Sequence, residues 1–128
     1  MNILVTGGAG FIGSHLCEYL LARGDRVVAL DNLNDYYSPA IKRRNIEASL
    51  SDDRMTFVEG DILDVALLES VFDKCKFDVV VHLAARAGVR PSLVDPILYE
   101  QVNCLGTLNI LEQMRKRGLK RLVFASSS

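Results

Sequence analysis

Thr6-Gly7-Gly8-Ala9-Gly10-Phe11-Ile12-Gly13 follows the apolar run Ile3-Leu4-Val5 and opens a segment with helical spacing. A buried strand, a tight glycine turn and a helix N-terminus together form a cradle for a pyrophosphate, because backbone N–H groups point outward and the helix dipole favours an anion. Gly7 permits the turn, Gly10 lets the backbone approach the phosphates, and Gly13 lets the helix lie close to the strand. This context predicts a dinucleotide site rather than a glycine turn that only links a strand to a helix.

A carboxylate stands where such a site needs one. Asp31 ends a second apolar run, 27–30, about 20 residues beyond the turn, where its oxygens can accept hydrogen bonds from a ribose diol. A 2′-phosphate at that position would face like charge, so we expect NAD(H) to bind in preference to NADP(H). Arg43 and Arg44 would weaken this preference if they folded back toward Asp31.

Length and composition are typical of one globular domain without a nucleic-acid or membrane partner. The 128 residues carry 15 basic and 16 acidic side chains, a net charge of -1, so no basic surface for nucleic acid or an anionic membrane is expected. Cys17, Cys75 and Cys104 lack metal-ligand spacing and are interpreted as reduced packing residues. With no signal peptide or membrane-spanning run at the N-terminus, we expect a cytoplasmic location and no metal.

Strand-like apolar runs alternate with helix-like periodic segments along the whole chain. The predicted strands are 2–6, 26–31, 55–60, 78–83 and 121–126, and the predicted helices are 11–23, 39–50, 64–74 and 96–117. Such alternation predicts an α/β fold, a single Rossmann-type doubly wound parallel sheet of five strands in the order 3-2-1-4-5 with helices on both faces. Ligands should then bind beyond the carboxyl ends of strands 1 and 4, where the winding reverses.

Two details of the predicted helices can be checked against the structure. Ser38 and Asp95 each precede a proline and are predicted to cap a helix N-terminus. The apolar face that the last helix is expected to turn toward the sheet consists of Val102, Leu105, Leu108, Ile110 and Leu111.

Several further residues are candidates from local sequence. Asp61 and Ile62 follow the third strand, where they could flank an adenine ring, although a turn role for Asp61 fits the sequence equally well. Ala84 and Ala85 are small enough for a cofactor to lie against. Asn103 is polar on an apolar helix face and needs a partner, either a neighbouring backbone group or a bound ribose.

Other polar residues favour plainer interpretations. His82 lies inside an apolar run and is interpreted as a core histidine with satisfied hydrogen bonds. Tyr36 and Tyr37 follow Asp31 and could cover part of a cofactor, but surface packing is favoured. The serines at 126–128 could supply a hydroxyl to a reacting oxygen or form a frayed tail.

Five segments together resemble the extended short-chain dehydrogenase/reductase family and, within it, the N-terminal part of the UDP-glucuronate 4-epimerases. They are the glycine motif at 6–13, Asp-Asn-Leu-Asn-Asp-Tyr-Tyr at 31–37, His-Leu-Ala-Ala at 82–85, Ala-Gly-Val-Arg at 87–90 and Ala-Ser-Ser-Ser at 125–128. The segments 31–37 and 87–90 favour uronate epimerases over other sugar-nucleotide enzymes. The resemblance covers nearly the whole chain but less than half of a full-length member.

The resemblance implies a role for each matching position. The implied roles are Gly7, Gly10, Phe11, Ile12 and Gly13 in the pyrophosphate turn, Asp31 and Asn32 with Asn34 at the adenosine ribose, Asp61 and Ile62 at adenine, Leu83, Ala84 and Ala85 along the cofactor cleft, Asn103 near the nicotinamide ribose, Ser127 as the catalytic hydroxyl and Arg90 near the sugar nucleotide. Arg86 departs from the pattern, which has glutamine there.

The resemblance also indicates what these residues lack. Family members oxidise the sugar at C4 with a tyrosine base that is followed four residues later by lysine, and none of Tyr19, Tyr36, Tyr37 and Tyr99 has that lysine. We therefore expect residues 1–128 to be a truncated NAD-binding Rossmann domain without the C-terminal substrate domain. Such a module would be inactive alone and would bind a nucleotide sugar only if a substrate domain were supplied.

Two alternatives remain open. The chain could be an active minimal enzyme that recruits its base from another chain, or a non-catalytic sensor or scaffold with NAD as a regulatory ligand. In the truncated domain the predicted strand 121–126 would be a free edge with apolar Leu122, Val123 and Phe124. We expect a homodimer through this strand or the last helix.

Overall fold

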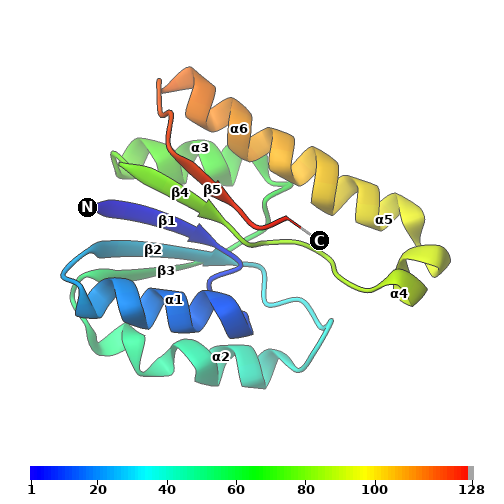
Figure 1. Ribbon diagram of the computed structural model, residues 1–128, viewed down its shortest axis with the longest axis horizontal. Coiled ribbons are helices and arrows are strands. Elements are labelled where there is room, and N and C mark those ends of the chain that lie inside the picture. The colour runs from blue at the N-terminus through cyan, green and yellow to red at the C-terminus, as the bar shows by residue number, and fades with distance from the viewer. Residues whose placement is uncertain (127–128) are drawn as a thin grey trace.

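The fold is a parallel five-stranded sheet with its strands in the order β3-β2-β1-β4-β5 (Figure 1). A computed structural model describes residues 1–126. Its strands are β1 (Asn2–Thr6), β2 (Arg26–Asp31), β3 (Met55–Glu59), β4 (Val79–His82) and β5 (Leu122–Phe124). The predicted strand order is confirmed.

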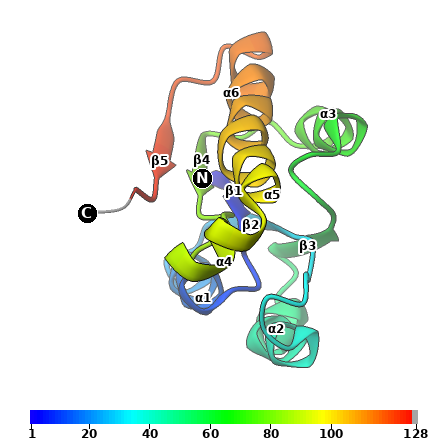
Figure 2. The same cartoon turned by 90° about the vertical axis from the view of Figure 1, so that its right-hand side faces the viewer.

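Helices cover both faces of this sheet, as predicted (Figures 1 and 2). The helices are α1 (Phe11–Ala22), α2 (Pro39–Glu47), α3 (Val65–Lys74), α4 (Val89–Val94), α5 (Pro96–Glu100) and α6 (Gly106–Lys116), with a short 3₁₀ turn at Ser49–Ser51 and a π-helical turn at Gln101–Leu105. Side chains of β1 alternate between the two faces: Ile3 and Val5 join the core beneath α1, whereas Leu4 joins the core beneath α3 and α6.

The register brings the carboxyl ends of three strands to one edge of the sheet. Thr6 of β1 pairs with Leu30 of β2 and with His82 of β4. Because the glycine turn, the loop after Asp31 and the loop after β4 all start at this edge, they lie together at the point where the winding reverses.

The structure corrects the predicted loop and helix around residues 84–117. Helix α4 forms within the predicted loop after β4, and the predicted helix 96–117 contains a π-helical turn at Gln101–Leu105. The buried positions of α6 are Gly106, Ile110, Gln113 and Met114, which recur at α-helical spacing. Of the predicted apolar face, Leu105, Leu108 and Leu111 are instead exposed.

Of the two predicted helix caps, one is confirmed and the other is wrong. Asp95 accepts a hydrogen bond from the Leu98 N–H at 3.1 Å and caps α5. Ser38 precedes α2 but makes no capping hydrogen bond through its side chain, so that prediction is wrong. Asp64, which was predicted as the first residue of its helix, caps α3 through the Leu67 N–H.

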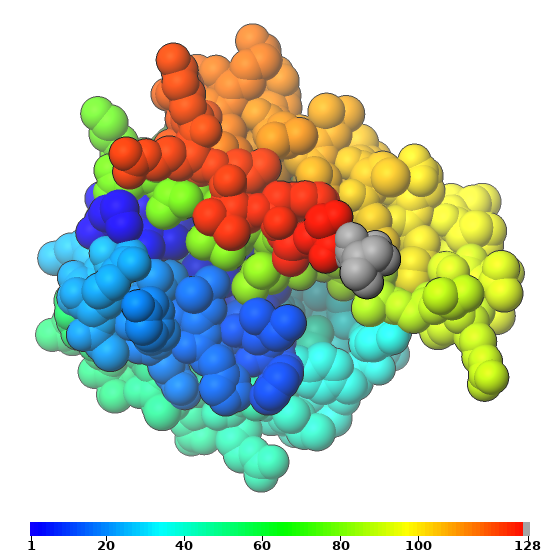
Figure 3. Space-filling model, viewed as in Figure 1, coloured from blue at the N-terminus to red at the C-terminus, as the bar shows by residue number. Residues whose placement is uncertain are grey.

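Figure 3 shows β5 at the surface beside α6, so this edge of the sheet is open on the face in view. Val123 and Phe124 of β5 are about half exposed, at 55% and 52%. No helix within residues 1–126 has both the length and the apolar character needed to cross a membrane.

Candidate functional site: a dinucleotide cleft

The turn between β1 and α1 has the backbone geometry that a glycine motif predicts. Gly7 has a φ of +71°, a conformation that L side chains rarely adopt, and its N–H donates to the Leu30 carbonyl at 2.8 Å. A Cβ added at Gly7 would lie 2.9 Å from the Ala84 nitrogen. Gly7 therefore permits both the turn and the close approach of the chain after β4.

Helix α1 begins directly against this turn. The Gly10 N–H donates to the Gly7 carbonyl at 3.1 Å, and a Cβ on Gly13 would overlap that same carbonyl oxygen. The side chains of Phe11 and Ile12 are largely exposed. Since the first amides of a helix have no acceptor within the helix, the α1 N-terminus presents N–H groups suited to an anion.

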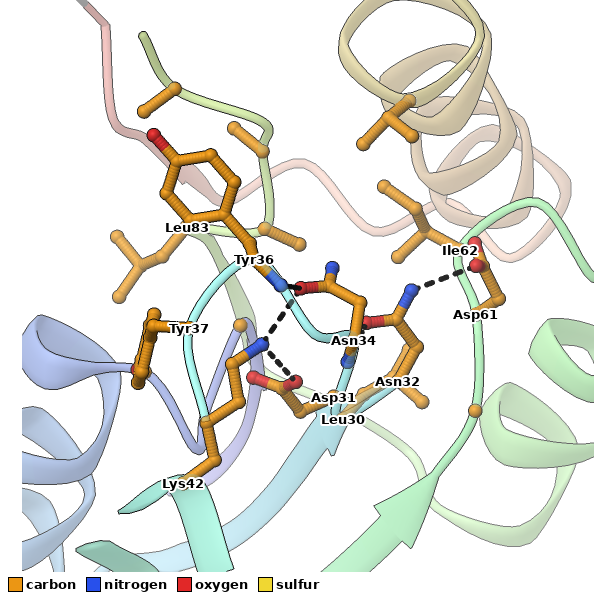
Figure 4. A pocket seen from close by; sticks show the side chains of 17 residues that line it. Leu30, Asp31, Asn32, Asn34, Tyr36, Tyr37, Lys42, Asp61, Ile62 and Leu83 are labelled. Carbon is orange, nitrogen blue, oxygen red and sulfur yellow. Dashed lines mark hydrogen bonds and ion pairs between the residues drawn. The ribbon is translucent and has the colours of Figure 1, made fainter. Parts of the chain in front are cut away.

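A cavity of about 220 Å³ lies beside the turn at the carboxyl edge of the sheet (Figure 4). Its walls bring together many of the predicted cofactor residues: Gly7, Gly10, Asp31, Asn32, Asn34, Asp61, Ile62, Leu83, Ala84 and Ala85. The walls also include Tyr36 and Tyr37, which could cover part of a cofactor, and residues that were not predicted to bind one: Leu30, Lys42, Gly60, Ala87 and Val102.

Asp31 is buried at the floor of this cavity and is held by the backbone around it. One carboxylate oxygen accepts from the Ala9 N–H at 3.1 Å, and the other accepts from the Leu33 N–H at 2.9 Å. Each carboxylate oxygen can accept more than one hydrogen bond, so the group keeps acceptor capacity for a ligand. The Lys42 ammonium lies 3.5 Å from the second oxygen.

Three polar residues extend the site from Asp31 toward β3. The Asn32 amide donates to the Asp61 carboxylate at 2.9 Å, while its oxygen accepts from the Asn34 N–H at 3.1 Å (Figure 4). Asp61 also accepts from the Leu63 N–H at 2.8 Å, which is the turn role considered for it. Ile62 is buried beside these groups and supplies an apolar wall.

On the other side, β4 is fixed by a buried hydrogen-bond chain through His82. The Thr107 hydroxyl donates to the Asn103 carbonyl at 2.7 Å and so accepts from His82 Nε2 at 2.9 Å. His82 Nδ1 then accepts from the Thr6 hydroxyl at 2.6 Å. Burial lowers the pKa of His82, which favours this neutral form. His82 is therefore a core residue with satisfied hydrogen bonds, as interpreted from sequence.

The Thr6 hydroxyl also accepts from the Ala84 N–H at 3.2 Å, which fixes the strand end against the cavity. Asn103, by contrast, does not line the cavity: its side chain accepts from the Arg86 N–H at 2.8 Å and donates to the Arg86 carbonyl at 3.0 Å. The neighbouring-backbone partner considered for Asn103 is the one that the structure contains. Arg90 is exposed on α4, and Ser127 lies outside the described residues.

Lys42 and Tyr37 are the polar residues of the site to which sequence reasoning gave too little weight. Lys42 is buried on α2, and its ammonium donates to Asn34 Oδ1 at 3.1 Å and lies 5.1 Å from the centre of the Tyr37 ring. Burial raises the pKa of Tyr37, and the Asp31 carboxylate raises it further. Tyr37 ends the segment 31–37 that carries the family resemblance, whereas Lys42 belongs to no motif and lies in the basic run 42–44, which gives no sign of its burial.

Comparison with known proteins identifies the family. The profile described as GDP-mannose 4,6 dehydratase matches residues 4–128. The chain belongs to this family. The match confirms the resemblance to the extended short-chain dehydrogenase/reductases that the glycine motif and the segment after Asp31 indicate.

Several relatives of this chain are sugar-nucleotide epimerases. It is 45% identical to UDP-glucuronate 4-epimerase 3 of Arabidopsis thaliana over 99% of its residues and 46% identical to the UDP-glucose 4-epimerase of Erwinia amylovora over 100%. The crystal structure of Thermus thermophilus UDP-glucose 4-epimerase in complex with NAD superimposes with a TM-score of 0.85 at 45% identity over 99% of the chain.

The chain spans only part of each relative's length. It covers 30% of the Arabidopsis epimerase, 37% of the Erwinia epimerase and 38% of the Thermus chain. The matching portion is the N-terminal one.

Proposed function

We propose that this chain supplies the NAD-binding part of a UDP-sugar 4-epimerase. The observation that carries the proposal is the cavity that joins the glycine turn before α1 to the buried carboxylate of Asp31. The Thermus epimerase, which superimposes on this chain, was crystallised with NAD. The residues of the cleft fit NAD. Glycine at position 7 keeps the cleft open, because a Cβ there would meet the Ala84 backbone and narrow it.

In this proposal the pyrophosphate binds to the amides that begin α1, from Phe11 to Gly13. Asp31 accepts hydrogen bonds from the hydroxyls of the adenosine ribose, and the Asn32–Asp61 pair together with Ile62 borders the adenine. Bound NAD would supply the hydride acceptor and donor for epimerisation at the sugar C4. The residues of this chain bind and orient the cofactor for that exchange.

Three predicted residues remain: Asn103 and Arg90, which do not line the cavity, and Ser127, which lies outside the described residues. Asn103 holds the backbone at Arg86 and so shapes the cleft wall beyond Ala85. We propose Ser127 as the hydroxyl near the reacting oxygen and Arg90 as a contact of the sugar nucleotide. Both roles come from the match to the epimerase pattern in the segments 125–128 and 87–90.

The proposed substrate of the whole enzyme is UDP-glucuronate. The segments 31–37 and 87–90 favour a uronate epimerase, whereas identities of 45% and 46% to a UDP-glucuronate and a UDP-glucose epimerase do not separate the two. None of the four tyrosines in these residues has lysine four positions later, so residues 1–128 contain no Tyr-x-x-x-Lys base. We propose that these 128 residues alone bind NAD without epimerising the sugar.

The test is to purify the 128-residue chain, supply NAD⁺ and UDP-glucuronate, and follow UDP-galacturonate by chromatography. We expect no product above a protein-free control. Product formation by the pure chain would overturn the proposed inactivity and favour the active minimal enzyme. NAD⁺ binding without turnover, together with a change in the binding of a partner protein, would favour the sensor or scaffold.

We further propose a cytoplasmic location and self-association as a homodimer. Support for the cytoplasmic location comes from the free, widely spaced cysteines. Support for the dimer comes from the exposed side chains of β5 and α6, above all Val123, Phe124 and Leu108.

A further inference from the structure

Lys42 is a buried cation in the wall of the proposed cofactor cleft. Its side chain is only 7% exposed, and lysine is almost never buried in this way without a partner. Its ammonium donates to Asn34 Oδ1 at 3.1 Å and lies 3.5 Å from Asp31 Oδ1 (Figure 4). The Tyr37 ring, 5.1 Å from the ammonium, adds a cation–π contact that keeps the side chain in place.

The ion pair changes the charge that a ligand meets at Asp31. The Asp31 side chain is 6% exposed, so both charges lie in an environment where solvent screens them little. Together they are electrically neutral. A 2′-phosphate near Asp31 would therefore meet a carboxylate whose repulsion is largely offset by the ammonium beside it.

The other cations of α2 do not account for this effect. Arg43 points away to Glu59 of β3, with a nitrogen-to-oxygen distance of 3.1 Å, and both side chains are more than half exposed. Lys42 is thus the α2 side chain that forms an ion pair with Asp31 in the described residues. The basic residue of α2 that could weaken the preference for NAD is therefore Lys42, rather than Arg43 or Arg44 as the sequence suggested.

We propose that Lys42 is a specificity-determining residue for the cofactor, and that it lowers the preference for NAD⁺ over NADP⁺ below the preference that Asp31 alone would give. This inference rests on the proposed binding of NAD in the cleft. The quantity that measures it is the ratio of the two dissociation constants, Kd for NADP⁺ divided by Kd for NAD⁺, because a purely structural role would change both constants together.

The experiment is calorimetric titration of the 128-residue chain and its variants with NAD⁺ and with NADP⁺. Lys42→Met removes the charge, and Lys42→Gln removes the charge but keeps an N–H donor for Asn34 if the methionine variant does not fold. We expect either variant to raise the ratio roughly tenfold, because Asp31 is left uncompensated. Lys42→Arg keeps the charge and should leave the ratio within about twofold of the starting value.

Lys120→Met is the matched control, because it removes an exposed lysine that does not line the cleft. It should leave both constants unchanged. An unchanged or lower ratio in a folded Lys42→Met or Lys42→Gln variant would overturn the inference while leaving NAD binding intact. Failure of the unaltered chain to bind NAD⁺ would instead contradict the proposed function itself.

Discussion

The side chain of Asn103 makes two hydrogen bonds to the backbone of a single residue, Arg86: it accepts from the N–H at 2.8 Å and donates to the carbonyl at 3.0 Å. Asn103 lies in the π-helical turn Gln101–Leu105, and Arg86 lies in the loop after β4. The contact therefore ties a helical irregularity to the loop that borders the cofactor cleft. Such π-helical turns are frequent at functional sites.

Removing this contact should loosen the loop. Asn103→Ala leaves the partly buried Arg86 N–H and carbonyl without their partner, and we expect the free energy of unfolding to fall by about 1–3 kcal/mol. Hydrogen exchange measured at the Arg86 amide should become faster, while Gln101→Ala, an exposed change in the same turn, should leave it unaltered. Unchanged exchange at Arg86 in Asn103→Ala would show that the loop is held by other contacts.

Gly7 and Gly118 provide a matched pair for testing the glycine turn. Both have a positive φ, +71° and +66°, but a Cβ at Gly7 meets the Ala84 backbone whereas one at Gly118 has nothing within 4 Å. Gly118→Ala should cost only the left-handed strain, about 1–2 kcal/mol. Gly7→Ala should cost about 1–3 kcal/mol more from the clash, as measured by urea unfolding. Equal losses would mean that the turn accommodates a side chain.

Stability should depend on pH through His82. Burial lowers the pKa of His82 in the folded chain, so the unfolded chain binds the proton first as pH falls. The free energy of unfolding should therefore be fully retained above about pH 6.5 and should fall as pH drops from there toward the lower folded pKa. Urea unfolding at a series of pH values measures this. His82→Gln should flatten the fall in this window.

Self-association should depend on the exposed apolar side chains of β5 and α6. Leu108 is 58% exposed on α6, and Phe124 is 52% exposed on β5. We expect a dimer of the 128-residue chain in sedimentation velocity, because burying these side chains removes apolar area from water. Leu108→Lys and Phe124→Lys should shift the equilibrium toward monomer. A monomer at high micromolar concentration in the unaltered chain would contradict the prediction.

The sheet could be predicted because its signals are local and repeated. Each of β1, β2 and β4 is a short apolar run that a helix-like segment follows, and the strand order then follows from right-handed crossovers. The π-helical turn at Gln101–Leu105 has no such signal. Leu108 is exposed for a simpler reason: it lies two residues before the buried Ile110, about 200° around an α-helix, so the two side chains cannot share a face.

The cofactor cleft was predictable where a motif fixes the backbone and less so where tertiary contacts decide. Gly7 and Asp31 follow from the strand–turn–helix pattern itself. Lys42 lies in the basic run 42–44 of a polar helix, which is typical of a solvated face, yet the packing of α2 beside the glycine turn buries it. Asn103 illustrates the same limit, because both considered partners fitted the sequence and only the fold brings it to Arg86.

The most direct test of the account is calorimetric titration of the folded 128-residue chain with NAD⁺, with Asp31→Ala as the comparison. We predict saturable binding at one site per chain, together with a loss of affinity of roughly tenfold or more in Asp31→Ala, because the ribose hydroxyls lose a charged acceptor. Absence of saturable NAD⁺ binding by a chain whose circular dichroism shows the folded α/β structure would contradict the central claim.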